Sequence, residues 1–432
     1  MARKQIGLIM KTKNFRFIVA GIALIAVIAF SVRAKTAKER SLVVHEWGTF
    51  TSLQGGDGQL IYWKPLQTSE LPDFVHSWNN PGPGLPAVLG LGKGGMVAMQ
   101  RLETPVIYFY NDEKNPTKHV DVSVKFPNGR ITEWYPEATS IGPNAGVINR
   151  LMNSYTNAGY IDWTGITLMP SDSKRKLASD SSGSHYFAAR DTDANPLSSA
   201  KGPYNSHVEF EKFLFYRGVG NFKTPLLVTM NSDDAVTISN TGTEPLAHLF
   251  VLGIKDKAGN FITVDELKPG DQKTVPIETK TLSAPELTKK ISDSLAQALV
   301  KAGLYPREAA AMVETWKDSW FAEEGLRVLY ILPRAWTDRT LPMDLKPAPR
   351  ELARVMVGRA EILSPQIEQS LTMDLEKARQ GDSAAAADAR NTLHSLGRFA
   401  GPAFFRAMPS AQLPPEESER LTALLSDAAK NN

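Results

Sequence analysis

The chain has 432 residues, of which 42% are hydrophobic and 22% are charged, and it contains no cysteine. These values are typical of globular proteins, and they exclude a disordered chain or a protein with many membrane spans. The lack of cysteine excludes disulfides, thiolate zinc sites and cysteine nucleophiles. A single core rarely serves so long a chain, so the length predicts two or three domains.

The first 40 residues differ from the rest of the chain. Basic residues flank an uncharged apolar run at 17–32, which as a helix would be about 24 Å long. That is long for the core of a signal peptide and short for the roughly 30 Å hydrocarbon layer of a bilayer. A cleaved signal peptide and an uncleaved transmembrane signal anchor both stay open. Because positive flanks remain cytoplasmic, the sequence predicts an extracytoplasmic protein, either anchored in the inner membrane through residues 17–32 or periplasmic.

The leader also accounts for the positive charge of the whole chain. Residues 1–40 hold nine of the 49 Lys and Arg residues and one of the 46 acidic residues. The net charge of +3 therefore becomes −5 for residues 41–432. A nucleic-acid-binding protein keeps its basic surplus in its folded part, so the sequence predicts no nucleic-acid partner.

Residues 41–224 mostly show strand patterns. Apolar and polar residues alternate at 119–126, Asn128-Gly129 is typical of a tight turn, and 131–135 is the expected returning strand of a hairpin. A long loop is expected at the proline- and glycine-rich residues 79–95, and a short strand at 185–190. Short strands separated by turns predict a sandwich.

Two further regions follow. Residues 225–281 contain five or six short strand patterns, which resemble an immunoglobulin-like sandwich. Beyond them, Ser283 and Glu286 have capping-box spacing at a helix start, and Trp316 and Trp320 share one face of a later helix. The sequence thus predicts a multidomain β plus α fold, in chain order a signal peptide or signal anchor (1–40), a β-rich, sandwich-like domain (41–224), an immunoglobulin-like β-sandwich (225–281) and a mainly helical region with one strand near 326–332 (282–432).

A histidine and a glutamate stand side by side in the first strand of the exported part. His45 and Glu46 cannot form a zincin motif, because Thr49 occupies the position of the second histidine. On a regular strand the two side chains point to opposite faces, and Gly48 is where a bulge would bring them together. Two interpretations follow: a structural strand, or a catalytic site formed by His45, Glu46 and Glu209.

Cofactor sites have weak support in the sequence. None of the seven histidines pairs with another at metal-ligand spacing, but His185 precedes Asp191 closely enough for the two to meet at one centre. With His45 as a further ligand, these residues are the candidates for a divalent metal. Glycines at 90, 92 and 95 match a dinucleotide-binding pattern by letter but lack a βαβ unit around them, so neither NAD nor a nucleotide is expected.

Four stretches together resemble a family of exported bacterial proteins of unknown function. They are HEWGTFTS at 45–52, EKFLFYRG at 211–218, GLRVLYILPR at 325–334 and VMVGRAEILSP at 355–365. The resemblance covers residues 41 to 408, and it implies export and a shared architecture but no chemistry and no site residues.

Two functions therefore remain as hypotheses. The first is a membrane-anchored envelope protein that binds another envelope protein or a glycan. The second is an extracytoplasmic hydrolase, metal-assisted in one version, with its site at the His45 strand. The hydrolase requires His45 to lie within about 5 Å of another histidine or carboxylate, in a pocket bordered by the loop at 79–95.

Overall fold

The computed structural model describes residues 42–63, 71–78, 97–111, 116–142, 158–200, 208–232, 234–277, 281–408 and 415–430. The leader with its apolar run at 17–32 and the loop expected at 79–95 lie outside these ranges. Within them, no helix is both long and apolar enough to cross a membrane.

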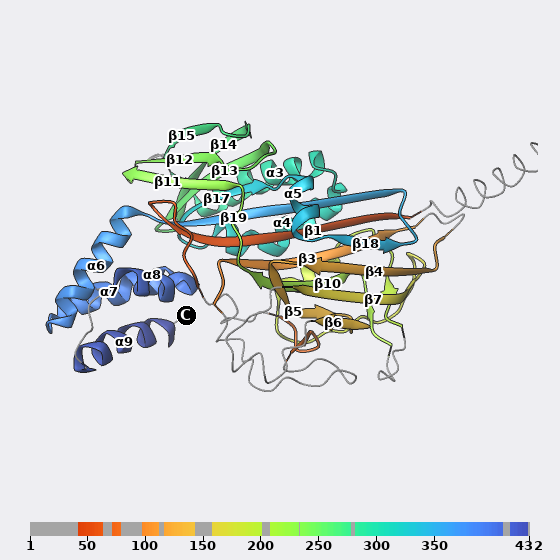
Figure 1. Cartoon of the computed structure of the whole chain (residues 1–432), viewed down its shortest axis with the longest axis horizontal. Helices are drawn as coiled ribbons and strands as arrows, with labels where there is room; N and C mark the ends of the chain where they lie inside the picture. The colour runs from red at the N-terminus through yellow and green to blue at the C-terminus, as the bar shows by residue number, and fades with distance from the viewer. Residues whose placement is uncertain are drawn as a thin grey trace, which may run out of the picture.

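The chain is a mixed α/β protein in which β-rich sheets are followed by C-terminal helices (Figure 1). The largest sheet of the described residues has ten strands. In spatial order they are β16 (Leu282–Ser283), β14 (Ala258–Leu267), β13 (Leu246–Lys255), β17 (Gly325–Ile331), β19 (Glu351–Leu363), β1 (Val43–Gly55), β3 (Gln100–Tyr110), β10 (Leu214–Gly220), β5 (Gly129–Tyr135) and β2 (His76–Ser77).

Strand β1 lies inside this sheet, parallel to β19 and antiparallel to β3, and all of its 13 residues are buried. The bulge that the sequence suggests in β1 is absent, because β1 pairs residue by residue with β19. A bulge does lie opposite Gly48, but its extra residue belongs to β3, where both Thr104 and Pro105 face this one glycine. A Cβ atom on Gly48 would lie 2.9 Å from the Cα atom of Pro105, so only glycine fits there.

Two smaller sheets cover one face of the large sheet. The six-stranded sheet contains β18 (Met343–Lys346), β4 (His119–Phe126), β7 (Gly159–Leu168), β8 (Leu197–Ser198) and β9 (Phe210–Glu211), with β6 (Ser140–Gly142) paired to β7. The three-stranded sheet contains β11 (Leu226–Ser232), β12 (Ala235–Asn240) and β15 (Gln272–Pro276). A single apolar core joins the three sheets.

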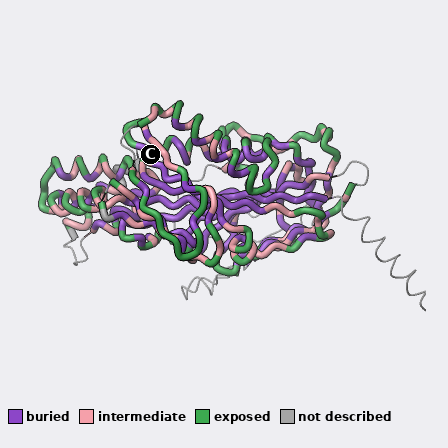
Figure 2. The backbone as a smooth tube through the Cα atoms, turned by 90° about the horizontal axis from the view of Figure 1, so that it is seen from above, coloured by how far each residue is buried: buried purple, intermediate pink, exposed green. Residues whose placement is uncertain are grey.

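Helices cover the other face and one end of the large sheet. The helix α3 (Ala284–Lys301), the helix α4 (Pro306–Phe321) and the short 3₁₀ helix η2 (His185–Arg190) pack on the face opposite the small sheets. Four helices cluster at one end (Figure 1) and share a core with Leu53 of β1 and Leu363 of β19. They are α6 (Pro365–Arg379), α7 (Ser383–Ser395), α8 (Ala400–Ala407) and α9 (Pro415–Lys430), with the short 3₁₀ helix η3 (Gly397–Phe399) before α8. The short helix α5 (Arg334–Thr340) lies apart from them, with Trp336 against the core between the sheets. Figure 2 shows the buried strands running through the middle of the molecule.

The expected division at 41–224, 225–281 and 282–432 does not follow the strand pairing. The large sheet takes strands from all three ranges. The range 225–281 is expected as a separate immunoglobulin-like domain, but β13 and β14 belong to the large sheet, and only β11, β12 and β15 form a sheet of their own. The strands of residues 225–281 do lie in two facing layers, but one of these layers is the large sheet, which also contains strands from the rest of the chain.

Strand β19 corrects the prediction of a helical region with one strand. The expected strand near 326–332 is β17, but residues 351–363, expected to belong to helices, form a strand of equal length to β1. The residues of β19 from Arg354 onward are all buried, since layers cover both faces of the sheet. A strand buried on both faces shows no alternation of apolar and polar residues, and this removes the usual sign of a strand.

Two local predictions also differ from the structure. The turn at Asn128-Gly129 connects β4 to β5, but β4 pairs with β7 and β18, whereas β5 pairs with β10 and β2. The turn therefore joins two layers and does not close a hairpin. Residues 185–190 form η2 and not a strand, because the Ser184 hydroxyl accepts a hydrogen bond from the Tyr186 N–H and starts a helical turn.

The predicted helices are confirmed where their capping signals are strong. Ser283 and Glu286 form the capping box that begins α3, and Gly303 follows its end with a φ of +115°. Trp316 and Trp320 of α4 are buried in the core, as their spacing indicates.

Candidate functional site

His45 is fully buried between the large sheet and α4. Its Nδ1 atom lies 2.6 Å from Oε2 of Glu308, and the rings of Tyr110 and Tyr305 pack against the imidazole. The same Glu308 oxygen accepts a hydrogen bond from the Tyr305 N–H at the start of α4. The histidine thus has a carboxylate within the distance that the hydrolase hypothesis requires, but neither side chain is exposed to solvent.

Glu46 lies on the opposite face of β1, as strand geometry predicts. It accepts hydrogen bonds of 2.6 Å from the Tyr216 hydroxyl and 2.6 Å from Nε of Arg354, its neighbour across the strand pair. Because the sheet separates Glu46 from His45, the two residues do not act on one substrate. Each has buried hydrogen-bonding partners of its own, which is a structural arrangement.

The other predicted site residues lie apart from His45. Oε1 of Glu209 lies 2.9 Å from Nε2 of His76, which belongs to β2, an edge strand of the large sheet. The ring of His185 packs on Trp316, and Asp191 accepts hydrogen bonds from the exposed Arg307. The described residues contain no group of three His, Asp or Glu side chains that could hold a metal ion. The structure therefore does not bring His45, His185 and Asp191 together.

A second buried ionic group lies on the α4 side of the sheet. Glu103 accepts hydrogen bonds from the Thr51 hydroxyl and from Nη1 of Arg398, and Nε of Arg101 is 3.1 Å away. Burial by itself would raise the pKa of the Glu103 carboxyl, but the guanidinium groups of Arg398, Arg101 and Arg359 outweigh burial and lower it to about 2. Glu103 thus connects the sheet to the C-terminal helices through Arg398.

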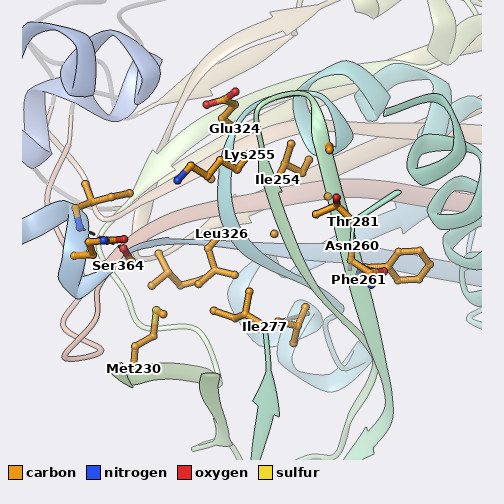
Figure 3. A pocket seen from close by; sticks show the side chains of 18 of the residues that line it. Met230, Ile254, Lys255, Asn260, Phe261, Ile277, Thr281, Glu324, Leu326 and Ser364 are labelled. Atoms are coloured by element: carbon orange, nitrogen blue, oxygen red, sulfur yellow. Dashed lines mark hydrogen bonds between the residues drawn. The ribbon is translucent and has the colours of Figure 1, made fainter. Parts of the chain in front are cut away.

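A cavity of about 570 Å³ lies where the large sheet, the three-stranded sheet and the C-terminal helices meet (Figure 3). We call it the junction cavity. Its walls are mainly aliphatic, and they come from β13, β14, β17 and β19 on one side and from the three-stranded sheet and the helices on the other. The wall residues are Val251, Gly253, Ile254, Ile262, Leu326, Ile362, Met230, Ile277, Ile367 and Leu396.

Gly253 opens this cavity from the large sheet. It is an interior residue of β13, paired with Asn260 of β14 and Leu326 of β17. A Cβ atom there would meet only side-chain methyl groups, 3.7 Å from Ile277 and 3.9 Å from Leu326. The missing side chain of Gly253 therefore leaves room between the two sheets.

The rim of the junction cavity is polar. Glu324 and Lys255 lie at one side of it, and Asn260, Thr281 and Ser364 line other parts (Figure 3). The carboxylate of Glu324 accepts a hydrogen bond from the Asp256 N–H, which fixes its place. Aliphatic walls with a few polar groups at the rim are typical of sites that bind apolar ligands and not of sites that carry out proton transfer.

Sequence reasoning misses this site because its residues come from many distant elements. They are aliphatic, and each separately looks like an ordinary core residue. The available signal was Gly253, because a glycine inside an apolar strand indicates a close approach or a ligand. Glu308, the partner of His45, had a signal as well, since it stands at the third position of a helix that begins with proline.

Comparisons with known proteins do not identify the chain. No family model matches it, and no curated protein matches it. The resemblance to a family of exported bacterial proteins therefore stays a prediction. Among solved structures, the yeast delta-COP-I mu-homology domain, alone and complexed with a Dsl1 WxWxV peptide, aligns over 75% of this chain and 98% of that chain, at 9% and 8% identity and a TM-score of 0.27 in both cases. Such low TM-scores leave the likeness without weight for fold or function.

Proposed function

We propose that this chain is an exported envelope protein that acts by binding, and that its ligand enters the junction cavity. The observation that carries the proposal is the cavity itself, because aliphatic side chains from three parts of the fold surround an open space of about 570 Å³. A pocket of this size and lining suits the apolar part of a ligand. The support for export, and for anchoring through residues 17–32, comes from the sequence alone.

Binding has better support than hydrolysis. Of the three residues named for hydrolysis, His45 and Glu46 are fully buried on opposite faces of one strand, and each has its own hydrogen-bonding partner. The third, Glu209, pairs with His76 and not with either of them. The titratable residues that line the junction cavity are Lys255 and Glu324 at its rim, whereas acid–base catalysis needs such groups beside the reacting atoms.

Replacing Gly253 by leucine is expected to weaken ligand binding without unfolding the protein. The new side chain would extend toward Ile277 and Leu326 and occupy the space that an apolar ligand needs. With the uncharged fluorescent dye N-phenylnaphthylamine as a probe, the dissociation constant should rise about tenfold or more, which corresponds to about 1.4 kcal/mol. Fluorescence titration of wild type and Gly253→Leu measures this change.

Gly401→Leu is the matched control for this experiment. It adds the same side chain on α8 at a position where no atom lies within 4 Å of the added Cβ. This control should bind the dye as wild type does. Equal dye affinity in Gly253→Leu and wild type, with both proteins folded by circular dichroism, would show that the junction cavity is not the binding site.

A further inference from the structure

Strand β14 forms an incompletely covered edge of the large sheet, beside the junction cavity. On its inner side every residue of β14 except Asp265 pairs with β13. On its outer side β16 pairs with it antiparallel, but only at Ala258 and Gly259. Across the described part of the chain, no strand pairs with the rest of this outer side, residues 260–267, which we call the β14 edge.

Hydrogen bonds show which backbone groups of β14 point outward. The N–H of Phe261 donates to the side-chain oxygen of Asn260, so it does not point toward β13. The C=O of Leu267 accepts from the side-chain amide of Asn240, which agrees with the same outward direction. Backbone direction alternates along an antiparallel strand, and these two residues have the same parity. Thr263 and Asp265 share that parity, so their N–H and C=O groups also point outward.

The same alternation places one side chain of an added strand in the cavity. Directly opposed residues on antiparallel strands point their side chains to the same face. Ile262 lines the junction cavity, whereas Phe261 points away from its centre (Figure 3). A residue paired with Ile262 on a new strand would therefore direct its side chain into the cavity.

Charges beside β14 favour one direction for such a strand. Asp265 and Glu266 are exposed near the carboxyl end of β14, and Lys255 pairs with Ala258 at its amino end. An antiparallel strand, in the direction that β16 already takes, begins beside the two acids and ends near the lysine. A peptide with a basic amino-terminal part matches this distribution.

We propose that the ligand is an extended peptide segment of a partner protein, which adds as an antiparallel strand to the β14 edge and inserts an apolar side chain into the junction cavity opposite Ile262. This inference rests on the proposed function, and it names the class of ligand. Main-chain hydrogen bonds to Thr263 and Asp265 provide affinity, and the cavity and the two acids provide specificity.

A synthetic peptide of alternating leucine and threonine, with arginine at its amino end, tests this inference on the full chain. The peptide is expected to bind wild type, and Gly253→Leu should bind it about tenfold more weakly or worse. An otherwise identical peptide, N-methylated on the backbone amides of the paired edge, should also lose about tenfold or more, because several hydrogen bonds disappear. Hydrogen exchange at the amides of Thr263 and Asp265 should slow when the unmodified peptide binds.

The outcomes separate this inference from the proposed function. If the dye binds in the cavity but the peptide does not bind, or if N-methylation has no effect, strand addition is wrong and an apolar-ligand site remains. If neither the dye nor the peptide binds wild type, the proposed function fails, and this inference fails with it.

Discussion

Replacing Arg354 by methionine is expected to lower the free energy of unfolding by about 3–5 kcal/mol, because it leaves the carboxylate of Glu46 buried without its cationic partner. The Glu46 side chain has no solvent exposure, and Nε of Arg354 lies 2.6 Å from it. The Tyr216 hydroxyl remains as a donor, but a neutral hydrogen bond does not offset a buried charge. Urea unfolding of wild type and Arg354→Met measures the loss.

Two variants make this result specific. Arg339→Met removes an arginine that is 57% exposed and pairs with Glu244, so it should change stability by less than about 1 kcal/mol. The double variant Glu46→Gln, Arg354→Met also removes the unpaired buried charge. Its loss in free energy of unfolding should therefore be smaller than the sum of the losses in the two single variants. Additive losses, or an Arg354→Met protein as stable as Arg339→Met, would mean that the pair does not act as a unit.

The sequence predicts local structure best where a signal is complete within a few residues. The capping box of α3 is such a signal, and so is the alternation in β4, where Val120, Val122, Val124 and Phe126 are all buried. The opposite orientation of His45 and Glu46 follows from strand geometry alone. In each of these cases the deciding interactions lie between near neighbours in the chain.

Predictions fail where the decision depends on distant residues. Strand β19 lies parallel to β1 although some 300 positions separate them in the sequence, and nothing within residues 351–363 indicates that partner. The large sheet also runs across the expected divisions at 225 and 282, because a change in local pattern there says little about which strands pair. Similarly, β4 and β5 are neighbours in sequence but belong to different layers.

The sequence suggests a site at His45, whereas the structure suggests one at the junction cavity, and the difference again depends on distant residues. A titratable residue such as His45 can be recognised as a candidate site residue from its residue type alone. Whether they can act depends on exposure, and His45 is enclosed by α4, whose Glu308 is distant in sequence. The junction cavity has the opposite character, since no single wall residue suggests a function and only their assembly creates a space.

Glu103 should make a large contribution to the pH dependence of stability. Its pKa is about 2 in the folded protein because Arg398, Arg101 and Arg359 outweigh the effect of burial, whereas an unfolded glutamate titrates near 4.5. A lowered pKa stabilises the folded state above the unfolded pKa, and this stability is lost as the pH falls from about 4.5 toward 2. The difference of roughly 2.5 pKa units corresponds to about 3 kcal/mol at neutral pH.

Glu103→Gln is therefore expected to lower the free energy of unfolding by about 3 kcal/mol at pH 7 and by only about 1 kcal/mol at pH 3, where wild type has itself lost most of this stabilisation. Urea unfolding at a series of pH values measures the two curves, which should converge toward low pH. Glu314→Gln is the control, because Glu314 pairs with Lys317 on the exposed face of α4, and it should change stability by less than about 1 kcal/mol at either pH. A constant difference between wild type and Glu103→Gln across this range would show that the effect comes from packing. In that case, attraction between the Glu103 carboxylate and the surrounding guanidinium groups would not hold the C-terminal helices to the sheet.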